Sequence, residues 1–270
     1  MELQLNEKVI IVTGGAKGIG AAIVNLLANE NAIPVIVGRD ESHNLELLTQ
    51  IRNEGKKCFQ VVAELTKPES CEIVIEEVIR QCGRIDGLVN NAGANDGVGL
   101  ESGNYSRFME SLHKNVVHYY LMAHFALPYL KISRGVILNI GSKTAETGQG
   151  GTSAYAAASG ARNALTREWS VELLPYGIRV NSVIVAECWT PLYESWISTV
   201  VDPTAKLAAI RAKIPFENRM TTTEEIANTA AFLLSERSSH TTGQLVHVDG
   251  GYVHLDRAIA VEKTAESIYT

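Results

Sequence analysis

The stretch from Val9 to Val24 constrains the fold of this chain more than any other part of it. It begins with four β-branched residues, Val9–Val12, which are typical of a short and fully buried strand. Gly14, Gly18 and Gly20 follow, and an apolar helical pattern begins directly after them. Glycines allow the backbone to approach a ligand closely, and the N–H groups of a helix's first turn point at an anion. The stretch therefore predicts a strand, a phosphate-binding turn and a helix, although a simple tight turn would also explain the glycines.

Strand and helix patterns alternate along most of the chain. Strands are expected at residues 9–12, 33–37, 59–62, 85–89, 135–140, 178–184 and 245–248, and helices at 45–54, 68–83, 105–129, 153–174 and 223–234. This alternation predicts an α/β protein with one domain over 1–270, a Rossmann fold with a seven-stranded, parallel, doubly wound sheet. Residues 186–220, which prolines interrupt, are expected to form a small helical lid, and the tail 253–270 has no clear pattern. In such a sheet, the loops after the strands gather around the ligand.

The charge balance and the apolar runs exclude several classes of partner. Lysine and arginine number 24 against 30 aspartates and glutamates, and a net charge of −6 argues against a basic face for nucleic acid. The apolar runs are too short to cross a bilayer, and the N-terminus lacks the features of a secretory signal. We therefore expect a cytoplasmic protein that binds a small molecule and has neither a membrane nor a nucleic-acid partner.

No pattern in the chain indicates a metal site. The four cysteines, at positions 58, 71, 82 and 188, have neither metal-ligand nor disulfide spacing, and we interpret them as reduced thiols. His113, His118 and His124 lie on one predicted helix without a cluster of carboxylates. We expect these histidines to pack or to contact another subunit, and we expect no metal.

The motifs at the predicted strand ends resemble those of the short-chain dehydrogenase/reductase family, over about residues 7–252. They are Thr13-Gly14-xxx-Gly18-x-Gly20, Asn90-Asn91-Ala92-Gly93, Ser142, and Tyr155 thirteen residues later. The combination is specific, whereas each motif alone is not. The resemblance implies hydride transfer between a nicotinamide nucleotide and a hydroxyl or carbonyl substrate. It also implies a homotetramer, with the helices that carry Asn115 and Tyr155 buried between subunits.

The resemblance also implies a role for each matching residue. Tyr155 would be the acid/base at a substrate oxygen, Ser142 would hold that oxygen by a hydrogen bond, and Asn115 would anchor a water on the proton path. Glu64 stands where the family usually has aspartate, at the adenine edge. The residues expected to contact the cofactor are Gly14, Lys17, Gly18, Ile19, Gly20, Arg39, Glu64, Leu65, Asn91, Ala92, Gly93, Tyr155 and Thr190.

One catalytic position departs from the family's Tyr-x-x-x-Lys motif. This chain has Ser159 there, one helical turn after Tyr155 and on the same face. A lysine would favour the phenolate, drawing a tyrosine down from a free pKa of about 10, and would hold the nicotinamide ribose. Ser159 does neither, so the sequence predicts impaired catalysis on an intact cofactor-binding scaffold, or else an inactive dinucleotide-binding sensor or scaffold protein. Lys143 is a weak substitute, because neighbours at a strand end usually point to opposite sides.

The end of the second predicted strand indicates which nucleotide is bound. An acidic residue at position 38 would bond the ribose hydroxyls and repel a 2′-phosphate. This chain has Gly38 instead, with Arg39 beside it and Lys17 in the first loop. Two cations and no acid predict NADP as the preferred cofactor, and Asp40 leaves NAD possible.

The loops after the fifth and sixth predicted strands bear on the substrate. Glu187 would place a carboxylate beside the nicotinamide pocket, where it suits a substrate rich in hydroxyls, unless it only orders the lid. Together with 142–144, 148–151 and 166–169, this region is similar to sugar dehydrogenases of the L-fucose dehydrogenase type. Sterols and acyl-carrier-linked ketones remain alternatives. The residues expected to bind substrate are Ser142, Lys143, Gln149, Glu187 and Trp189.

Overall fold

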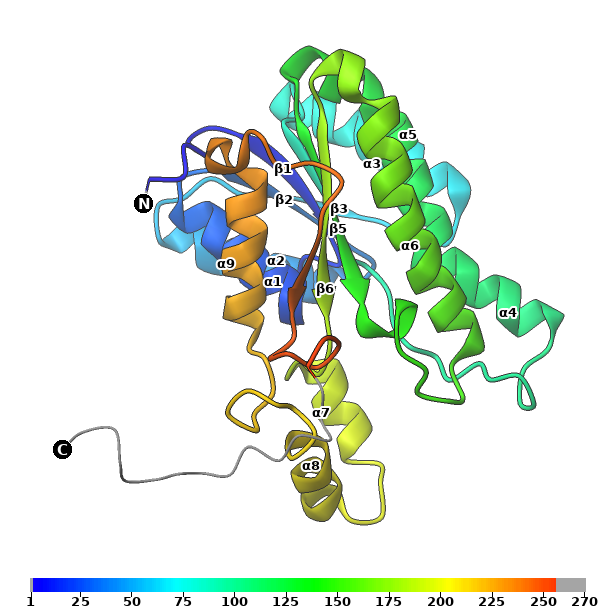
Figure 1. Ribbon diagram of the computed structural model, residues 1–270. Coiled ribbons are helices and arrows are strands. Elements are labelled where there is room, and N and C mark those ends of the chain that lie inside the picture. The colour runs from blue at the N-terminus through cyan, green and yellow to red at the C-terminus, as the bar shows by residue number, and fades with distance from the viewer. Residues whose placement is uncertain (1, 256–270) are drawn as a thin grey trace.

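A single parallel sheet of seven strands forms the centre of the molecule in the computed structural model, which describes residues 2–255 (Figure 1). The strands run in the order β3-β2-β1-β4-β5-β6-β7, and every neighbouring pair is parallel. From β1 the chain winds outward in both directions, which confirms the predicted doubly wound sheet. The strands are β1 (Val9–Thr13), β2 (Ile33–Gly38), β3 (Phe59–Val62), β4 (Gly87–Asn90), β5 (Val136–Ser142), β6 (Arg179–Val185) and β7 (Leu245–Val248).

Helices cover both faces of the sheet (Figure 1). One face carries α1 (Gly18–Asn29), α2 (Glu41–Asn53) and α9 (Thr223–Leu234), and the other carries α3 (Pro68–Cys82), α5 (His118–Ser133) and α6 (Ser153–Glu172). Alternate side chains of β1 enter the two cores: Val12 packs on the α1 side and Ile11 on the α3 side. Because both faces are buried, the strands read as continuous apolar runs in the sequence.

The segment 186–220, predicted as a helical lid, contains two short helices at one end of the molecule (Figure 1). These are α7 (Pro191–Ile197) and α8 (Pro203–Arg211), and each has a proline in its first turn. Thr190 caps α7 by accepting a hydrogen bond from the backbone N–H of Tyr193. The prolines that interrupt the helical pattern therefore begin helices, because proline lacks only an N–H that a first turn does not use.

The helix predicted over 105–129 is divided into three pieces. It consists of α4 (Tyr105–Leu112), a π-helical turn η1 (His113–Val117), and α5. The π-helical turn contains Asn115, one of the predicted catalytic residues. Such turns insert one residue into a helix and often lie at functional sites.

The remaining sequence expectations differ from the structure mainly at element ends. Helix α2 begins four residues before its predicted start, and β4 begins two residues after its predicted start. The predicted featureless tail lies mostly outside the described residues. Among the helices of the described part of the chain, none has both the length and the apolar character needed to span a membrane.

Candidate active site

The turn after β1 can be built only from glycines at its critical positions. Gly14 and Gly18 have φ values of +62° and +54°, in the left-handed region that favours glycine. A Cβ at Gly20 would collide with the carbonyl oxygen of Gly14, and a Cβ at Gly14 would lie 3.0 Å from the Cα of Ala92. The turn therefore leaves a space, bounded by backbone, into which a ligand can approach closely.

The start of α1 fits an anionic group. Lys17 occupies the N-cap position, but its side chain makes no capping hydrogen bond. The N–H groups of the first turn are consequently available to a phosphate, as expected for a dinucleotide-binding turn. The Lys17 side chain is exposed, and Ile19 is half-buried.

The turn after β4 is tied to the glycine turn by hydrogen bonds through Thr13. The Oγ1 atom of Thr13 accepts hydrogen bonds from the backbone N–H groups of Asn91, over 2.9 Å, and of Ala92, over 3.0 Å. The Nδ2 atom of Asn91 donates in return to the carbonyl oxygen of Thr13, over 2.9 Å. Two of the predicted cofactor-binding loops thus form one rigid unit.

The end of β2 has glycine at position 38, where an acidic side chain would bind a ribose. A Cβ at Gly38 would lie 2.5 Å from Oδ1 of Asn44, so the Asn44 side chain fills the place of a longer residue. Asp40 is used to cap α2, accepting from Ser42 Oγ and from the backbone N–H of His43. These hydrogen bonds lower the pKa of Asp40 to about 2.

The predicted adenine-edge residue Glu64 is held by its neighbours. Its Oε1 accepts hydrogen bonds from the backbone and the hydroxyl of Thr66, and its Oε2 lies 3.5 Å from Nη1 of Arg39. Burial raises the pKa of Glu64, but Thr66 and Arg39 lower it by more, and the net shift is downward. Leu65 is buried beside it. Arg39 remains largely exposed, with 75% of its side chain accessible.

Three hydroxyl groups form a chain between β5 and α6. Ser142 ends β5, and its Oγ caps the short 3-10 helix η2 (Lys143–Ala145) by accepting from the N–H of Thr144. The Oγ1 atom of Thr144 lies 3.0 Å from Ser142 Oγ and 3.0 Å from Ser159 Oγ. The structure therefore joins the predicted catalytic serine to the position where the family motif has a lysine.

Ser159 is fully buried and makes hydrogen bonds on both sides. Its Oγ donates to the carbonyl oxygen of Tyr155, over 2.7 Å, and accepts from Nη2 of Arg162, also over 2.7 Å. Tyr155, Ser159 and Arg162 lie on one face of α6, because they are separated by four and three residues. A serine hydroxyl can serve in both ways at once, since it has one proton and two lone pairs.

Arg162 brings a cation to Tyr155 that the sequence pattern did not predict. The side chain is 3% exposed, and its Cζ lies 5.3 Å from the centre of the Tyr155 ring and 5.4 Å from that of Tyr119. Its Nη1 donates to the Tyr119 hydroxyl and to the carbonyl oxygen of Ile140. Tyr155 therefore has a positive neighbour even though Ser159 replaces the family lysine. The spacing of 162 from 155 was the available signal, but an arginine on an alanine-rich helix usually faces solvent.

Lys143 is directed to a different group from the hydroxyl chain. Its Nζ pairs with Oε1 of Glu187 and lies 4.0 Å from the centre of the Tyr252 ring. The other carboxylate oxygen of Glu187 accepts from the hydroxyl of Tyr193 in α7, and burial together with this carboxylate raises the pKa of Tyr193. Glu187 thus links the loop after β5 to the segment predicted as a lid.

The other predicted site residues have separate roles. The amide of Asn115 is buried, accepting from the N–H of Ala94 over 2.8 Å and donating to the carbonyl oxygen of Ser111, and it so fixes the loop after β4. Thr190 lies over the glycine turn, since a Cβ at Gly18 would be 3.3 Å from its Cγ2. Gln149 lies in an exposed loop, and Trp189 is 37% exposed.

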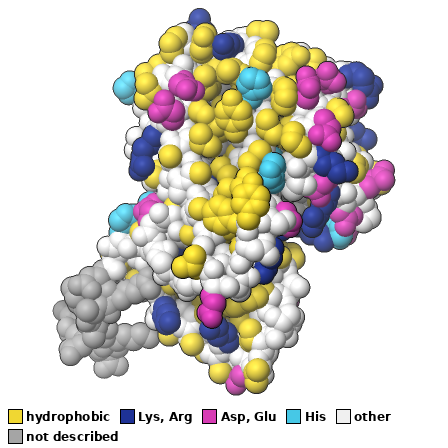
Figure 2. Space-filling model, turned by 90° about the vertical axis from the view of Figure 1, so that its right-hand side faces the viewer, with side chains coloured by type: hydrophobic (Ala, Val, Ile, Leu, Met, Phe, Trp, Pro, Cys, Tyr) yellow, Lys and Arg dark blue, Asp and Glu magenta, His cyan; other side chains and the backbone are white. Residues whose placement is uncertain are grey.

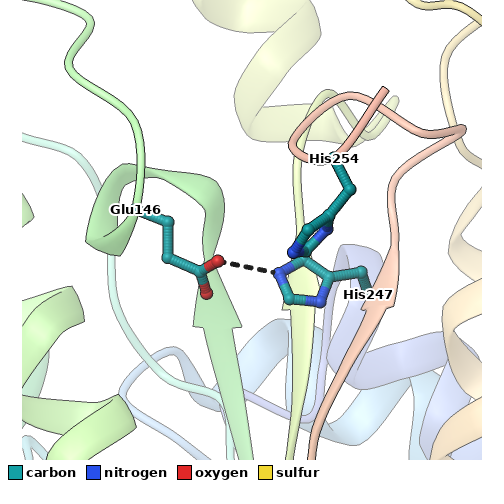
Figure 3. Close-up of side chains that lie close together, drawn as sticks. All are labelled: Glu146, His247 and His254. Carbon is teal, nitrogen blue, oxygen red and sulfur yellow. Dashed lines mark hydrogen bonds and ion pairs between the residues drawn. The ribbon is translucent and has the colours of Figure 1, made fainter. Parts of the chain in front are cut away.

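Glu146, His247 and His254 form a group that the sequence did not indicate (Figure 3). Nε2 of His247 lies 3.2 Å from Oε2 of Glu146, and the two imidazole rings meet edge to face. One possible ligand atom from each residue lies within 4.8 Å of the other two. His118, in contrast, packs as predicted: it is buried, and its Nε2 bonds the carbonyl oxygen of Lys114.

Comparisons with known proteins agree with this geometry. A family model described as enoyl-(acyl carrier protein) reductase matches residues 14–253. The chain is 34% identical to the L-fucose dehydrogenase of Bos taurus over 245 residues, which are 90% of this chain and 88% of that protein. The crystal structure of Cj0485 dehydrogenase is 45% identical, with a TM-score of 0.91 over 96% of this chain and 99% of that one. The ligand-free aldohexose dehydrogenase of Thermoplasma acidophilum is 28% identical, with a TM-score of 0.84 over 98% and 100%.

Proposed function

The chain belongs to the short-chain dehydrogenase/reductase family, and we propose that it is an NAD(P)-dependent enzyme that oxidises a hydroxyl group of a sugar such as L-fucose. The observation that carries this proposal is the chain of hydroxyls from Ser142 to Ser159, beside Tyr155 and at the same edge of the sheet as the glycine turn. Relatives named for L-fucose and aldohexose favour a sugar over a sterol or an acyl-carrier-linked ketone.

The side chains of this site would divide the work of proton transfer and positioning. The Tyr155 phenolate would take the proton of the substrate hydroxyl. Ser142 Oγ accepts from the Thr144 N–H, so its own proton remains available for a hydrogen bond to the substrate oxygen. A bound nicotinamide nucleotide supplies the hydride acceptor for this oxidation.

The groups that would hold the nucleotide lie in the loops after β1, β2, β3, β4 and β6. The glycine turn and the N-terminus of α1 would bind its pyrophosphate, and Asn91 to Gly93 and Thr190 would line the nicotinamide side. NADP is the expected preference. Asn44 fills the space beside Gly38, Asp40 is used in the cap of α2, and the exposed cations Arg39 and Lys17 would bind a 2′-phosphate.

Glu187 contributes to the substrate side in one of two ways. Its carboxylate could accept hydrogen bonds from sugar hydroxyls, together with Lys143, Gln149 and Trp189. Both of its oxygens already have protein partners, however, which favours an ordering role between the loop after β5 and α7. Glu187→Gln separates these roles: a sugar contact raises KM for the sugar alone, whereas an ordering role lowers kcat and thermal stability together.

The sequence also predicts that Ser159 impairs the activity. The alternative is that the chain has no activity and is a dinucleotide-binding sensor or scaffold. The part of the impairment that concerns the phenolate follows only if Tyr155 has no other cation beside it, and Arg162 lies there. The lost contact to the nicotinamide ribose would remain. Ser159→Lys tests the point directly, because turnover should rise well above that of the parent protein if the lost ammonium limits catalysis. Nucleotide binding without oxidation of any substrate, in both proteins, would favour the sensor.

We further propose a cytoplasmic homotetramer whose partner in catalysis is a small molecule. The apolar side chains exposed on α5, α6 and the turn after α6 include Tyr120, Ile132, Val171 and Leu174. Figure 2 shows hydrophobic side chains spread over the face of the molecule that carries these helices. Monomers rarely expose broad apolar surfaces without a partner, and a second copy fits the family resemblance.

The deciding experiment is an oxidation assay with a panel of sugars and both nucleotides, following nicotinamide reduction by absorbance. L-fucose or a related aldose should be oxidised, and Tyr155→Phe should reduce kcat by about a hundredfold or more while leaving nucleotide binding intact. Reduction of an acyl-carrier-linked ketone or a sterol with no sugar turnover would replace the substrate class. Unchanged turnover in Tyr155→Phe would overturn the proposed chemistry.

A further inference from the structure

We propose that Arg162 is the cation that stabilises the Tyr155 phenolate in this chain, in place of a lysine at position 159. The guanidinium would act from two helical turns along α6 instead of one. The catalytic part of this inference rests on the proposed function, in which Tyr155 is the acid/base. The charge relationship between the two side chains does not depend on the substrate.

The geometry places a permanent charge against the phenol. Arg162 lies with its Cζ 5.3 Å from the centre of the Tyr155 ring and is almost completely buried. A guanidinium keeps its proton at every accessible pH, and a buried charge acts more strongly on its neighbours than one in water. Burial lowers the pKa of Arg162, but the Tyr119 and Tyr155 phenols raise it by more, so the net shift is upward. A positive charge this close to a phenol favours the ionised form of that phenol.

Arg162 has no carboxylate to neutralise it within the described part of the chain. Its hydrogen-bond acceptors are the hydroxyls of Tyr119 and Ser159 and the carbonyl oxygen of Ile140, and none of the ion pairs among residues 2–255 includes it. Its Nε, also buried, has no hydrogen-bond partner. A buried charge without a counterion is costly, so a protein that keeps one gains from an anion close by.

Of the two phenols beside Arg162, Tyr155 is the one suited to supply that anion. Tyr119 is fully buried, its hydroxyl donates to the carbonyl oxygen of Ile140, and burial raises its pKa despite the arginine. It therefore stays neutral. Tyr155 is only partly buried and lies at the edge of the sheet where the substrate would bind. Tyr155 can therefore form the phenolate that balances the Arg162 charge, at the place where a substrate proton has to be removed.

The other titratable groups around this pair do not supply the charge. His118, on α5, has a pKa lowered by burial to about 4, with Arg162 adding to the effect, so it is neutral at working pH. Lys143, on η2, is paired with Glu187. The remaining neighbours, Thr144 and Ser159, are uncharged, and Ser159 holds one end of the guanidinium through Nη2.

Arg162 takes over only one of the two tasks that the family lysine performs. Its Nη1 and Nη2 atoms are bonded to protein groups beneath the site, so the guanidinium does not reach out to a ribose. We therefore expect substitution of Arg162 to act on kcat and its pH dependence, with little change in nucleotide affinity. A change in kcat without a change in nucleotide affinity distinguishes a charge effect on the phenol from the loss of a cofactor contact.

The test compares Arg162→Met with the double variant Ser159→Lys/Arg162→Met, which moves the cation to the family position. Absorbance difference titration of each protein against its Tyr155→Phe counterpart, without nucleotide or sugar, isolates the ionisation of one phenol. In Arg162→Met this ionisation should move upward by about one pH unit or more, and kcat near neutrality should fall at least tenfold and recover at alkaline pH. The double variant should reverse both changes. Arg167→Met, at an exposed position of the same helix, is the matched control and should change neither.

Two further variants keep the test informative if Arg162→Met does not fold. Tyr119→Phe removes one hydrogen bond of the guanidinium but leaves its charge, so the Tyr155 titration should stay as in the parent. Ser159→Lys with Arg162 intact places two cations together, so kcat at saturating nucleotide should not rise. A folded Arg162→Met protein with an unchanged Tyr155 titration, or a tenfold gain in kcat at saturating nucleotide from Ser159→Lys alone, overturns the inference. If the titration moves as expected but no sugar is oxidised, the proposed function fails and the role of Arg162 stands.

Discussion

The Nη2 atom of Arg162 donates a hydrogen bond of 2.7 Å to Ser159 Oγ, which joins the residue that departs from the family motif to the cation beside Tyr155. Ser159 also donates to the carbonyl oxygen of Tyr155, so all three residues are linked along one face of α6. The serine at 159 and the arginine at 162 therefore belong to one arrangement. Ser159 alone indicates that the positive charge of the family lysine is lost. Ser159 and Arg162 together indicate that this charge has moved to position 162.

Ser159→Ala should weaken this arrangement without removing the charge. Nη2 of Arg162 would lose its buried acceptor, and a buried donor without a partner costs about 1–3 kcal/mol. We expect the free energy of unfolding to fall by about that amount and kcat to fall roughly threefold to tenfold, with KM for the nucleotide unchanged. Urea unfolding and steady-state kinetics measure both effects. Turnover above that of the parent protein would contradict the positioning role of the serine.

Nucleotide preference should be reversible at the end of β2. Gly38→Asp combined with Asn44→Ala would introduce an acidic side chain into the space that Asn44 now fills. A carboxylate there would bond the ribose hydroxyls of NAD and repel a 2′-phosphate, so the ratio of dissociation constants should shift toward NAD by about tenfold, or 1.4 kcal/mol. Fluorescence titration with both nucleotides measures the ratio. The control Gly38→Ala/Asn44→Ala opens the same space without a charge, and a parent protein that already binds NAD more tightly would refute the NADP preference.

Much of the fold follows from local patterns in the chain. Residues 223–234 and 245–248 form a helix and a strand with the bounds that their apolar patterns predict. Pro68 begins α3, and Gly83, with a φ of +74°, ends it, because proline suits a first helical turn and glycine a left-handed cap. These features depend on residues close together in sequence, so a single chain is enough to predict them.

The parts that were missed depend on contacts between distant residues. The π-helical turn at 113–117 leaves the apolar pattern of the long helix almost continuous, so no local signal divides that helix. Arg162 is buried because Tyr119 and Ile140 receive its N–H groups, and these partners lie 43 and 22 residues away. Glu146 meets His247 across 101 residues for a similar reason, since β5 and β7 both end at this edge of the sheet. Local patterning contains none of these pairings.

Acid should destabilise the protein partly through His118. Burial lowers the pKa of His118 to about 4, against about 6.5 in an unfolded chain. A depressed histidine pKa contributes stability that is complete above about pH 6.5 and is lost as the pH falls toward 4, because the unfolded state then binds the proton more readily. Between pH 7 and pH 5 this single group should remove about 2 kcal/mol from the free energy of unfolding.

The variant His118→Asn keeps a hydrogen-bond donor but cannot titrate, so it separates this effect from general acid unfolding. Urea unfolding of both proteins at pH 7 and pH 5, at one protein concentration, should show the smaller loss in the variant. Equal losses in the two proteins would show that His118 is not a source of the acid sensitivity. Because the site is buried, the variant should be less stable than the parent at pH 7, and only the pH difference is diagnostic.

The proposed tetramer gives a prediction about the exposed apolar face of α5 and α6. Tyr120, on α5, is 51% exposed and stacks on His124, and Val171, on α6, is 64% exposed. If these helices are buried between subunits, Tyr120→Glu or Val171→Glu would enclose a carboxylate without a partner, at a cost of several kcal/mol. Sedimentation velocity should then show the parent as four chains and each variant as smaller species. Leu45→Glu on α2, at the opposite face of the sheet and 42% exposed, should remain tetrameric. A parent protein that sediments as a monomer at micromolar concentration would contradict the assembly. Turnover by that monomer would show that contacts on this face are not needed to hold Asn115 and Tyr155 in place.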